Sequence, residues 1–414
     1  MYGSHKDIMH NLKMFFIDGI SYMPSMALLS ITAVIPYYLS QLGATTFQIA
    51  LATAITLIGA LLTQPVFGVI ASRSAIMNKT FGKILLLQRL LFLVYVLLIP
   101  IFAGANAVLI NLFLIFWGVF NLFVGSYGIF FTPLVVKLLP PDKRGGTRGV
   151  GLAIGSFLGV GMSALIPLIL SRIAFPYSYM VIFSLGLIFL FVNAVVFLLM
   201  RQSKESVPNE PMDTKKYLTQ MPSTILESPA FRALILTCMS LAIANSLLTY
   251  YTLYAIRVFS ATEAHIAAFA GLAVLSGAVA YVVFGYVIDR HGPRLVTVIV
   301  AGLITAAGAL ALTTDSLGLL FVAWALANIG FSGYYFSATL LMGEISPTAK
   351  LPLYMGVFST ITMAISAVVV LLLAPVLENM GFSLLFIIVL ACGLLSLLVN
   401  VLVLRKRMAE LPSP

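Results

Sequence analysis

The chain alternates between long uninterrupted apolar segments and short polar ones. Twelve apolar segments can be counted, and as a helix each could cross a hydrocarbon layer of about 30 Å. A membrane-spanning strand would instead alternate apolar and polar residues. The pattern therefore predicts an all-α polytopic membrane protein with spans at 14–40, 46–70, 83–103, 107–136, 149–171, 178–200, 231–257, 264–288, 295–313, 318–345, 353–376 and 383–404.

Composition supports the membrane assignment. Of 414 residues, 61% are hydrophobic and 9% are charged, whereas a soluble domain has about 25% charged residues. Soluble and disordered chains are therefore excluded. Cys238 and Cys392 lie inside apolar segments, which excludes a disulfide scaffold and a Cys-rich metal site. We expect no metal and no cofactor.

Basic residues predict the orientation in the membrane. With the N-terminus inside, every Lys and Arg except Arg89, Arg172 and Arg257 falls in a segment on the cytoplasmic side. The positive-inside rule then predicts a multi-pass protein of the cytoplasmic membrane with both termini in the cytoplasm. It also accounts for the net charge of +10, so the lipid bilayer is the expected partner and nucleic acid is not.

A polar stretch at 201–230 divides six predicted helices from six. Its Pro, Ser and charge content predicts a cytoplasmic linker, with a short amphipathic helix near 213–227. The predicted domains are therefore 1–200, the linker 201–230, and 231–414.

The two halves share an internal repeat. Several residues of types that are rare in this chain recur 207 positions later, in the second half. Nearer the start of each half the separation is 217 positions, which pairs Val66-Phe67-Gly68 with Val283-Phe284-Gly285. Such matches in one register indicate a parallel duplication. The pairs at 207 include Trp117 with Trp324, Asn121 with Asn328, Tyr127 with Tyr334, and Pro140 with Pro347.

The segment GYVIDRHGPR at 285–294 resembles the loop signature of the major facilitator superfamily, G-x-x-x-D-R-x-G-x-[RK]. The stretch after the second span keeps Gly68 and Arg73 but has Ser72 in place of the aspartate, and 139–149 resembles the family's basic loop before helix 5. The positions that carry the signature are Gly285, Asp289, Arg290, Gly292 and Arg294.

The resemblance implies two six-helix bundles related by a pseudo-twofold axis along the membrane normal. It also implies a secondary transporter that works by alternating access. The chain has no phosphate-binding GxxxxGK[ST] segment, no nucleophile elbow and no HExxH motif, so a primary pump and an enzyme are not expected.

Polar residues inside membrane helices are costly and therefore informative about function. In the first predicted helix, Asp18, Tyr22, Ser25 and Thr32 share one face at about 100° per residue. We interpret this face as a cavity lining in which Asp18 couples transport to protons. The alternative is that Asp18 caps the helix or snorkels to the interface.

Further polar residues lie on helices that line the central cavity in the family. Substrate contact is one interpretation, and hydrogen bonding between helices is the other. For single Asn residues we favour hydrogen bonding, whereas for the repeated Trp-Asn pairs we favour substrate contact. These residues are Trp117 and Asn121 on helix 4, Asn245, Thr249 and Thr252 on helix 7, and Trp324, Asn328, Ser332 and Tyr335 on helix 10.

Three other features have structural interpretations. Gly151, Gly155 and Gly159 on helix 5 are spaced for close helix packing. Arg89, on peripheral helix 3, is expected to snorkel or to pair structurally. Asp289 ends helix 8, where family symmetry places it near the N-terminus of helix 5 and Arg148, and this contact is the predicted cytoplasmic gate.

These features predict a monomeric, proton-coupled exporter of lipophilic or amphipathic small molecules. An uptake permease for a neutral polar solute such as a sugar is the first alternative. A non-transporting receptor or lipid scramblase on the same fold is the second.

Overall fold

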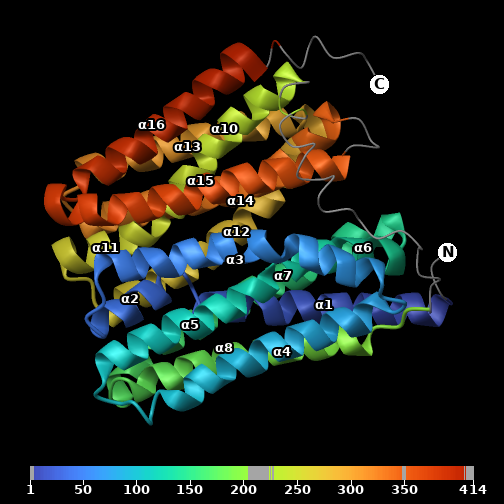
Figure 1. Ribbon diagram of the computed structural model, residues 1–414. Helices are drawn as coiled ribbons and strands as arrows, with labels where there is room; N and C mark the ends of the chain where they lie inside the picture. Colours follow the sequence, from blue (N-terminus) through green and yellow to red (C-terminus); the bar gives the residue numbers. More distant parts are fainter. Residues whose placement is uncertain are drawn as a thin grey trace. The chain divides into compact units, whose positions relative to one another are not determined.

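The computed structural model describes residues 4–203, 223, 225, 228–346, 351–404 and 406, with side chains at all of these except 141–149, 335, 336, 351 and 352. Within this part of the chain every regular element is a helix, as Figure 1 shows. The first half contains α1 (His5–Leu28), α2 (Val34–Gln41), α3 (Thr46–Ser72), α4 (Met77–Leu98), α5 (Asn106–Val124), α6 (Ser126–Leu138), α7 (Pro141–Arg172) and α8 (Tyr177–Leu199). The second half contains α10 (Pro229–Ser246), α11 (Leu248–Phe259), α12 (Glu263–His291), α13 (Pro293–Thr313), α14 (Leu317–Ile345), α15 (Leu351–Met380), α16 (Ser383–Val399) and the π-helix η2 (Asn400–Leu404).

Eleven helical segments of the described chain are long and apolar enough to cross a membrane. Two of these segments combine consecutive helices: α5 and α6 form one, and α10 and α11 form another. The predicted all-α polytopic fold is confirmed. The predicted span 14–40 is divided between α1 and α2, and α1 is not among the eleven: its 24 residues are long enough, but polar residues such as Lys13 and Asp18 leave it insufficiently apolar. In the interruption the Ser30 and Thr32 hydroxyls lie 3.3 Å apart.

Two further predicted spans are also interrupted. The span at 107–136 is broken at Gly125, where a Cβ atom would lie 2.6 Å from the Ala60 carbonyl oxygen of α3. Thr63 Oγ1 donates to the Leu122 carbonyl at 2.5 Å, which helps satisfy the backbone next to this break. The span at 231–257 is broken at Leu247, between α10 and α11. The first helix of each half is therefore discontinuous.

The chain divides into two compact units. One contains Met1–Thr45, Ile55–Met212 and Thr262–Val274, and the other contains Thr46–Ala54, Asp213–Ala261 and Leu275–Pro414. Apart from residues 223 and 225, the short helix predicted near 213–227 lies outside the described residues.

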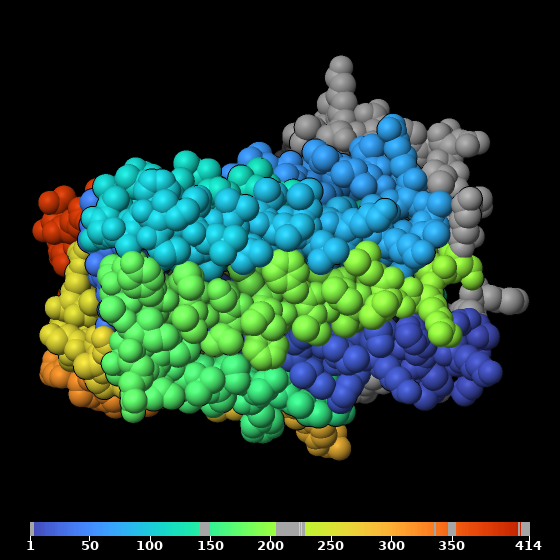
Figure 2. Space-filling model, turned by 90° about the horizontal axis from the view of Figure 1, so that it is seen from below, coloured from blue at the N-terminus to red at the C-terminus, as the bar shows by residue number. Residues whose placement is uncertain are grey.

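In the first unit, α8 lies between α4 and α1, as Figure 2 shows by the green surface between light blue and dark blue. Aromatic side chains fill the space between these helices. The rings of Phe81 and Phe130 are stacked 5.5 Å apart, and Phe197 contacts both Phe81 and Phe15. Large aliphatic side chains on α4 and α8, such as Leu97 and Ile188, are exposed, as expected of faces covered by lipid.

Candidate functional site

Asp18 is buried in the first unit. Its side chain is 5% exposed, and Oδ1 accepts a hydrogen bond from Nδ2 of Asn193 on α8 at 2.5 Å. Ser21 Oγ donates to the Asp18 backbone carbonyl at 3.2 Å. The side chain bonds to a neighbouring helix inside the bundle, which does not fit the alternative of a capping or snorkelling residue.

Arg89 lies in the middle of α4 and is 0% exposed. Its Nη2 donates to Asn193 Oδ1 at 3.0 Å and to the Tyr127 hydroxyl on α6 at 2.6 Å. Its Nη1 donates to Gln88 Oε1 and to the Leu85 carbonyl, and its Nε donates to the Leu190 carbonyl at 3.3 Å. The guanidinium does not snorkel but pairs inside the bundle.

Asn193 therefore contacts both buried charges, because its amide nitrogen faces Asp18 and its amide oxygen faces Arg89. The sequence interpretation did not include Asn193, Tyr127 or Gln88. One signal was present: Asn193 is the polar interruption in an otherwise apolar run at 186–199. Asp18 and Arg89 are the only charged residues that are buried in the described part of the chain.

The other polar residues of the α1 face are less enclosed. Tyr22 and Thr32 are half-buried, and Ser25 is buried. The Ser25 hydroxyl donates to the Tyr22 carbonyl at 2.6 Å, within its own helix. Asp18 is therefore the member of this face that bonds across to α8.

The repeated Trp-Asn pairs adopt the same arrangement in both units. Asn121 Nδ2 donates to the Trp117 carbonyl at 2.8 Å, and Asn328 Nδ2 donates to the Trp324 carbonyl at 2.9 Å. Each amide thus bonds to the carbonyl one helical turn earlier. Trp117 Nε1 also donates to Thr56 Oγ1 on α3 at 3.2 Å. Only the Trp117–Thr56 bond joins two helices, and substrate contact by the pairs stays a prediction.

The remaining predicted cavity residues lie around the break between α10 and α11 or on α14. Asn245 is half-buried, and its carbonyl accepts from the Leu247 N–H at the break. Thr249 and Thr252 are fully buried on α11. On α14, the Ser332 hydroxyl donates to the Asn328 carbonyl at 3.1 Å, and the side chain of Tyr335 lies outside the described residues.

The signature segment 285–294 forms the end of α12 and the start of α13. Gly292 has a φ of +80° and a ψ of 163°, and its N–H donates to the Ile288 carbonyl at 2.9 Å. That backbone conformation is essentially restricted to glycine. Pro293 follows at the first position of α13, which favours helix initiation.

Charged residues of this segment are accessible. Asp289 and Arg290 are exposed, and the Arg290 guanidinium carbon lies 4.4 Å from the centre of the Tyr286 ring. Gly285 and Arg294 are half-buried. The side chain of Arg148, the predicted partner of Asp289, lies outside the described residues, so the gate stays a prediction.

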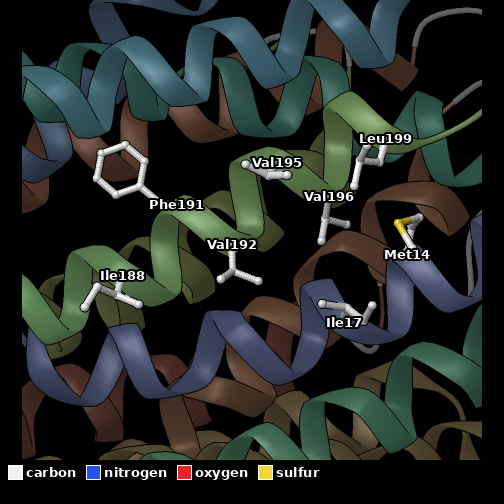
Figure 3. A pocket seen from close by; sticks show the side chains of 8 residues that line it. All are labelled: Met14, Ile17, Ile188, Phe191, Val192, Val195, Val196 and Leu199. Carbon is white, nitrogen blue, oxygen red and sulfur yellow. The ribbon is translucent and has the colours of Figure 1, made fainter.

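An apolar groove of about 480 Å³ lies between α1 and α8. Figure 3 shows the side chains that line it. Its wall includes exposed aliphatic side chains of α8, which places it on a lateral face of the bundle. None of the predicted cavity residues contributes to it. Its lining residues are Met14, Ile17, Ile188, Phe191, Val192, Val195, Val196 and Leu199.

Among the described residues, no group of three or more His, Cys, Asp or Glu side chains could hold a metal ion. The site that the structure describes consists of a carboxylate, a guanidinium and the amide between them.

A helical membrane fold, discontinuous first helices in both halves and two buried charged residues joined through an asparagine are typical of polytopic transport proteins. The sequence profile of the Major Facilitator Superfamily matches residues 14–280 and 255–414. The chain belongs to the major facilitator superfamily, a family of secondary transporters.

Solved structures support the fold. The human organic anion transporter MFSD10 is 13% identical, with a TM-score of 0.67 and coverage of 95% of this chain and 99% of that one. A D323A mutant of the nucleoside transporter NupG is 12% identical, with a TM-score of 0.68 and coverage of 97% and 100%. A bacterial homologue of the human lysosomal transporter Spinster, in an inward-facing and unoccupied conformation, is 14% identical, with a TM-score of 0.60 and coverage of 98% and 96%. No curated protein matches the chain significantly.

Proposed function

We propose that this secondary transporter is a proton-coupled exporter of lipophilic or amphipathic small molecules. Asp18 carries the proposal, because it is a buried carboxylate on the first helix and bonds directly to another helix of its bundle. Burial disfavours the charged form of a carboxyl group, and hydrogen-bond donors favour it. A group balanced in this way can take up a proton from one side of the membrane and release it to the other.

The proposed substrate class follows from how the polar side chains are used. The hydroxyls of Ser25 and Ser332 and the amides of Asn121 and Asn328 donate to backbone carbonyls of their own helices. Donors engaged in this way contribute less to binding a sugar, so an amphipathic substrate is favoured. The Arg89 guanidinium is also fully engaged, which argues against an organic anion of the kind carried by MFSD10.

In this proposal the protein acts as a monomer in the cytoplasmic membrane, with both termini in the cytoplasm. Its partners are the small-molecule substrate, protons and the surrounding lipid. The proposed direction of transport is export, and the substrate leaves the cell in exchange for protons that enter it.

Purified protein in liposomes tests the proposal. An imposed pH gradient should drive accumulation of an amphipathic dye, and Asp18→Asn should abolish this accumulation while leaving downhill exchange intact. Asp7→Asn is the matched control, because Asp7 lies on the same helix but is only half-buried and pairs with Arg201 at 3.2 Å. It should keep the accumulation of the unmodified protein.

The same liposomes separate the alternatives. Gradient-driven uptake of sugars but not dyes would indicate a permease for polar solutes. Movement of labelled lipid with no solute transport would indicate a scramblase. Accumulation by Asp18→Asn at the unmodified rate would rule out Asp18 as the coupling group.

A further inference from the structure

Arg89 is an expensive residue to bury, and its contacts indicate why it is present. A guanidinium has five N–H donors, and five hydrogen bonds engage it, to Leu85, Gln88, Tyr127, Leu190 and Asn193. An apolar side chain would join the helices at lower desolvation cost. A buried cation here therefore points to a use for its charge.

The Arg89 contact fixes the orientation of the Asn193 amide. Arginine can only donate, so the Asn193 atom that faces it must be the amide oxygen. The amide N–H₂ group is then left to face Asp18, to which it donates at 2.5 Å. Arg89 thereby presents a donor to the Asp18 carboxylate through one intervening side chain.

Few other titratable groups face this site. In the described part of the chain, Arg89 of α4 donates to Asn193 and to Tyr127 of α6, and the titratable residues of α1 on either side of Asp18 are Lys13 and Tyr22. Helix α7, which packs along α1, has no titratable side chain between Val150 and Ser171, and α8 has Tyr177 and Tyr179 only at its beginning.

The internal repeat provides a comparison within the chain. At the offset of 207, Asn193 corresponds to Asn400, the first residue of η2. Asn400 is also fully buried, but in the described structure neither its side-chain nitrogen nor its side-chain oxygen has a hydrogen-bond partner. The asparagine is therefore present in both halves, whereas the buried charged side chains of the described residues, Asp18 and Arg89, both lie around Asn193.

We propose that Arg89 and Asn193 are positioning residues that hold the Asp18 carboxylate ionised and oriented until a proton arrives. This inference rests on Asp18 being the proton-coupling group. When the carboxylate takes a proton from the aqueous phase, its charge-assisted bond to Asn193 weakens, and Arg89 loses its nearby counter-charge. The attraction between α1 and α8 then changes with each proton bound and released.

Infrared titration of the purified full-length protein in lipid tests the inference, with the Asp18 carboxyl band identified by its loss in Asp18→Asn. Asn193→Leu removes the hydrogen bonds of this side chain to Asp18 and to Arg89. The near-isosteric Asn193→Asp replaces the N–H₂ donor that faces Asp18 with a second negative charge. In both variants, and in Arg89→Met, the half-protonation point of Asp18 should move to higher pH by about one unit. That shift is a tenfold change in proton affinity, or about 1.4 kcal/mol. Arg89→Lys keeps the positive charge, so its half-protonation point should lie between those of Arg89→Met and the unmodified protein.

Asn78→Leu is the matched control. Asn78 is another fully buried asparagine that joins α4 to α8, through bonds to the carbonyls of Phe197 and Met200 at 3.0 and 2.7 Å, but it contacts neither Asp18 nor Arg89. Its replacement should lower stability and leave the Asp18 half-protonation point in place.

An unchanged half-protonation point in folded Asn193→Asp and Arg89→Met overturns the inference, and so does an Asp18 band that does not titrate. The proposed function fails separately. If Asn193→Asp shifts the band but Asp18→Asn still concentrates substrate, the positioning role stands and proton coupling through Asp18 does not.

Discussion

Gly19 of α1 and Gly151 of α7 bring two helices into backbone contact. A Cβ atom on Gly19 would lie 2.9 Å from the Gly151 carbonyl carbon, and one on Gly151 would lie 2.7 Å from the Phe16 carbonyl oxygen. Gly155 and Gly159 continue the contact one and two turns further along α7. The glycine spacing of this helix therefore serves helix packing, and it positions the helix that carries Asp18.

Replacing Gly151 with alanine should destabilise the protein, because the added methyl group would overlap the α1 backbone. We expect a loss of about 1–3 kcal/mol in the free energy of unfolding, measured by thermal unfolding in detergent. Gly161→Ala is the control on the same helix, since nothing lies within 4 Å of its Cβ position. Equal stability of the two variants would contradict the packing assignment.

Removing the amides of Asn121 and Asn328 tests whether the Trp-Asn pairs pack helices or bind substrate. Because each amide bonds to a carbonyl of its own helix, Asn121→Ala and Asn328→Ala should each cost about 0.5–1.5 kcal/mol in stability. Transport assays should show an unchanged KM. A KM raised several-fold, without a loss of stability, would instead support substrate contact.

Gly292→Ala should destabilise the turn between α12 and α13. Nothing lies within 4 Å of the Cβ position, so the effect comes from the backbone conformation alone. A cost of about 1–3 kcal/mol is expected. Gly302→Ala, inside α13 and also without a neighbour within 4 Å, should cost less. Thermal unfolding of the two variants side by side distinguishes a backbone requirement from a general effect of alanine.

Asp289→Asn should weaken the predicted cytoplasmic gate. In a background with Cys238 and Cys392 replaced, single cysteines at positions 153 and 156 of α7 should react faster with a reagent added from the cytoplasmic side. Asp315→Asn, another exposed aspartate of the second half, is the control and should leave the rates unchanged. If Asp289→Asn changes neither labelling nor transport, the proposed gate is wrong.

Several features of this protein follow from the sequence alone. The membrane segments are determined by runs of apolar residues, because a bilayer leaves an extended apolar run few alternatives to a spanning helix. The family follows from a signature in which Gly292 supplies a conformation that other residues resist. Asp18 could also be singled out, because a carboxylate on a polar face of a membrane helix is costly wherever its partners lie.

The partners themselves were decided by tertiary structure. Arg89 meets Tyr127, Leu190 and Asn193, which lie 38 to 104 positions further along the chain, and no local pattern encodes such contacts. The Asn121 amide donates to the Trp117 carbonyl of its own helix, which the sequence pattern did not predict, because a side-chain rotamer depends on its surroundings. Helical periodicity determines which face a side chain lies on, whereas its hydrogen-bond partner depends on which helices pack against that face.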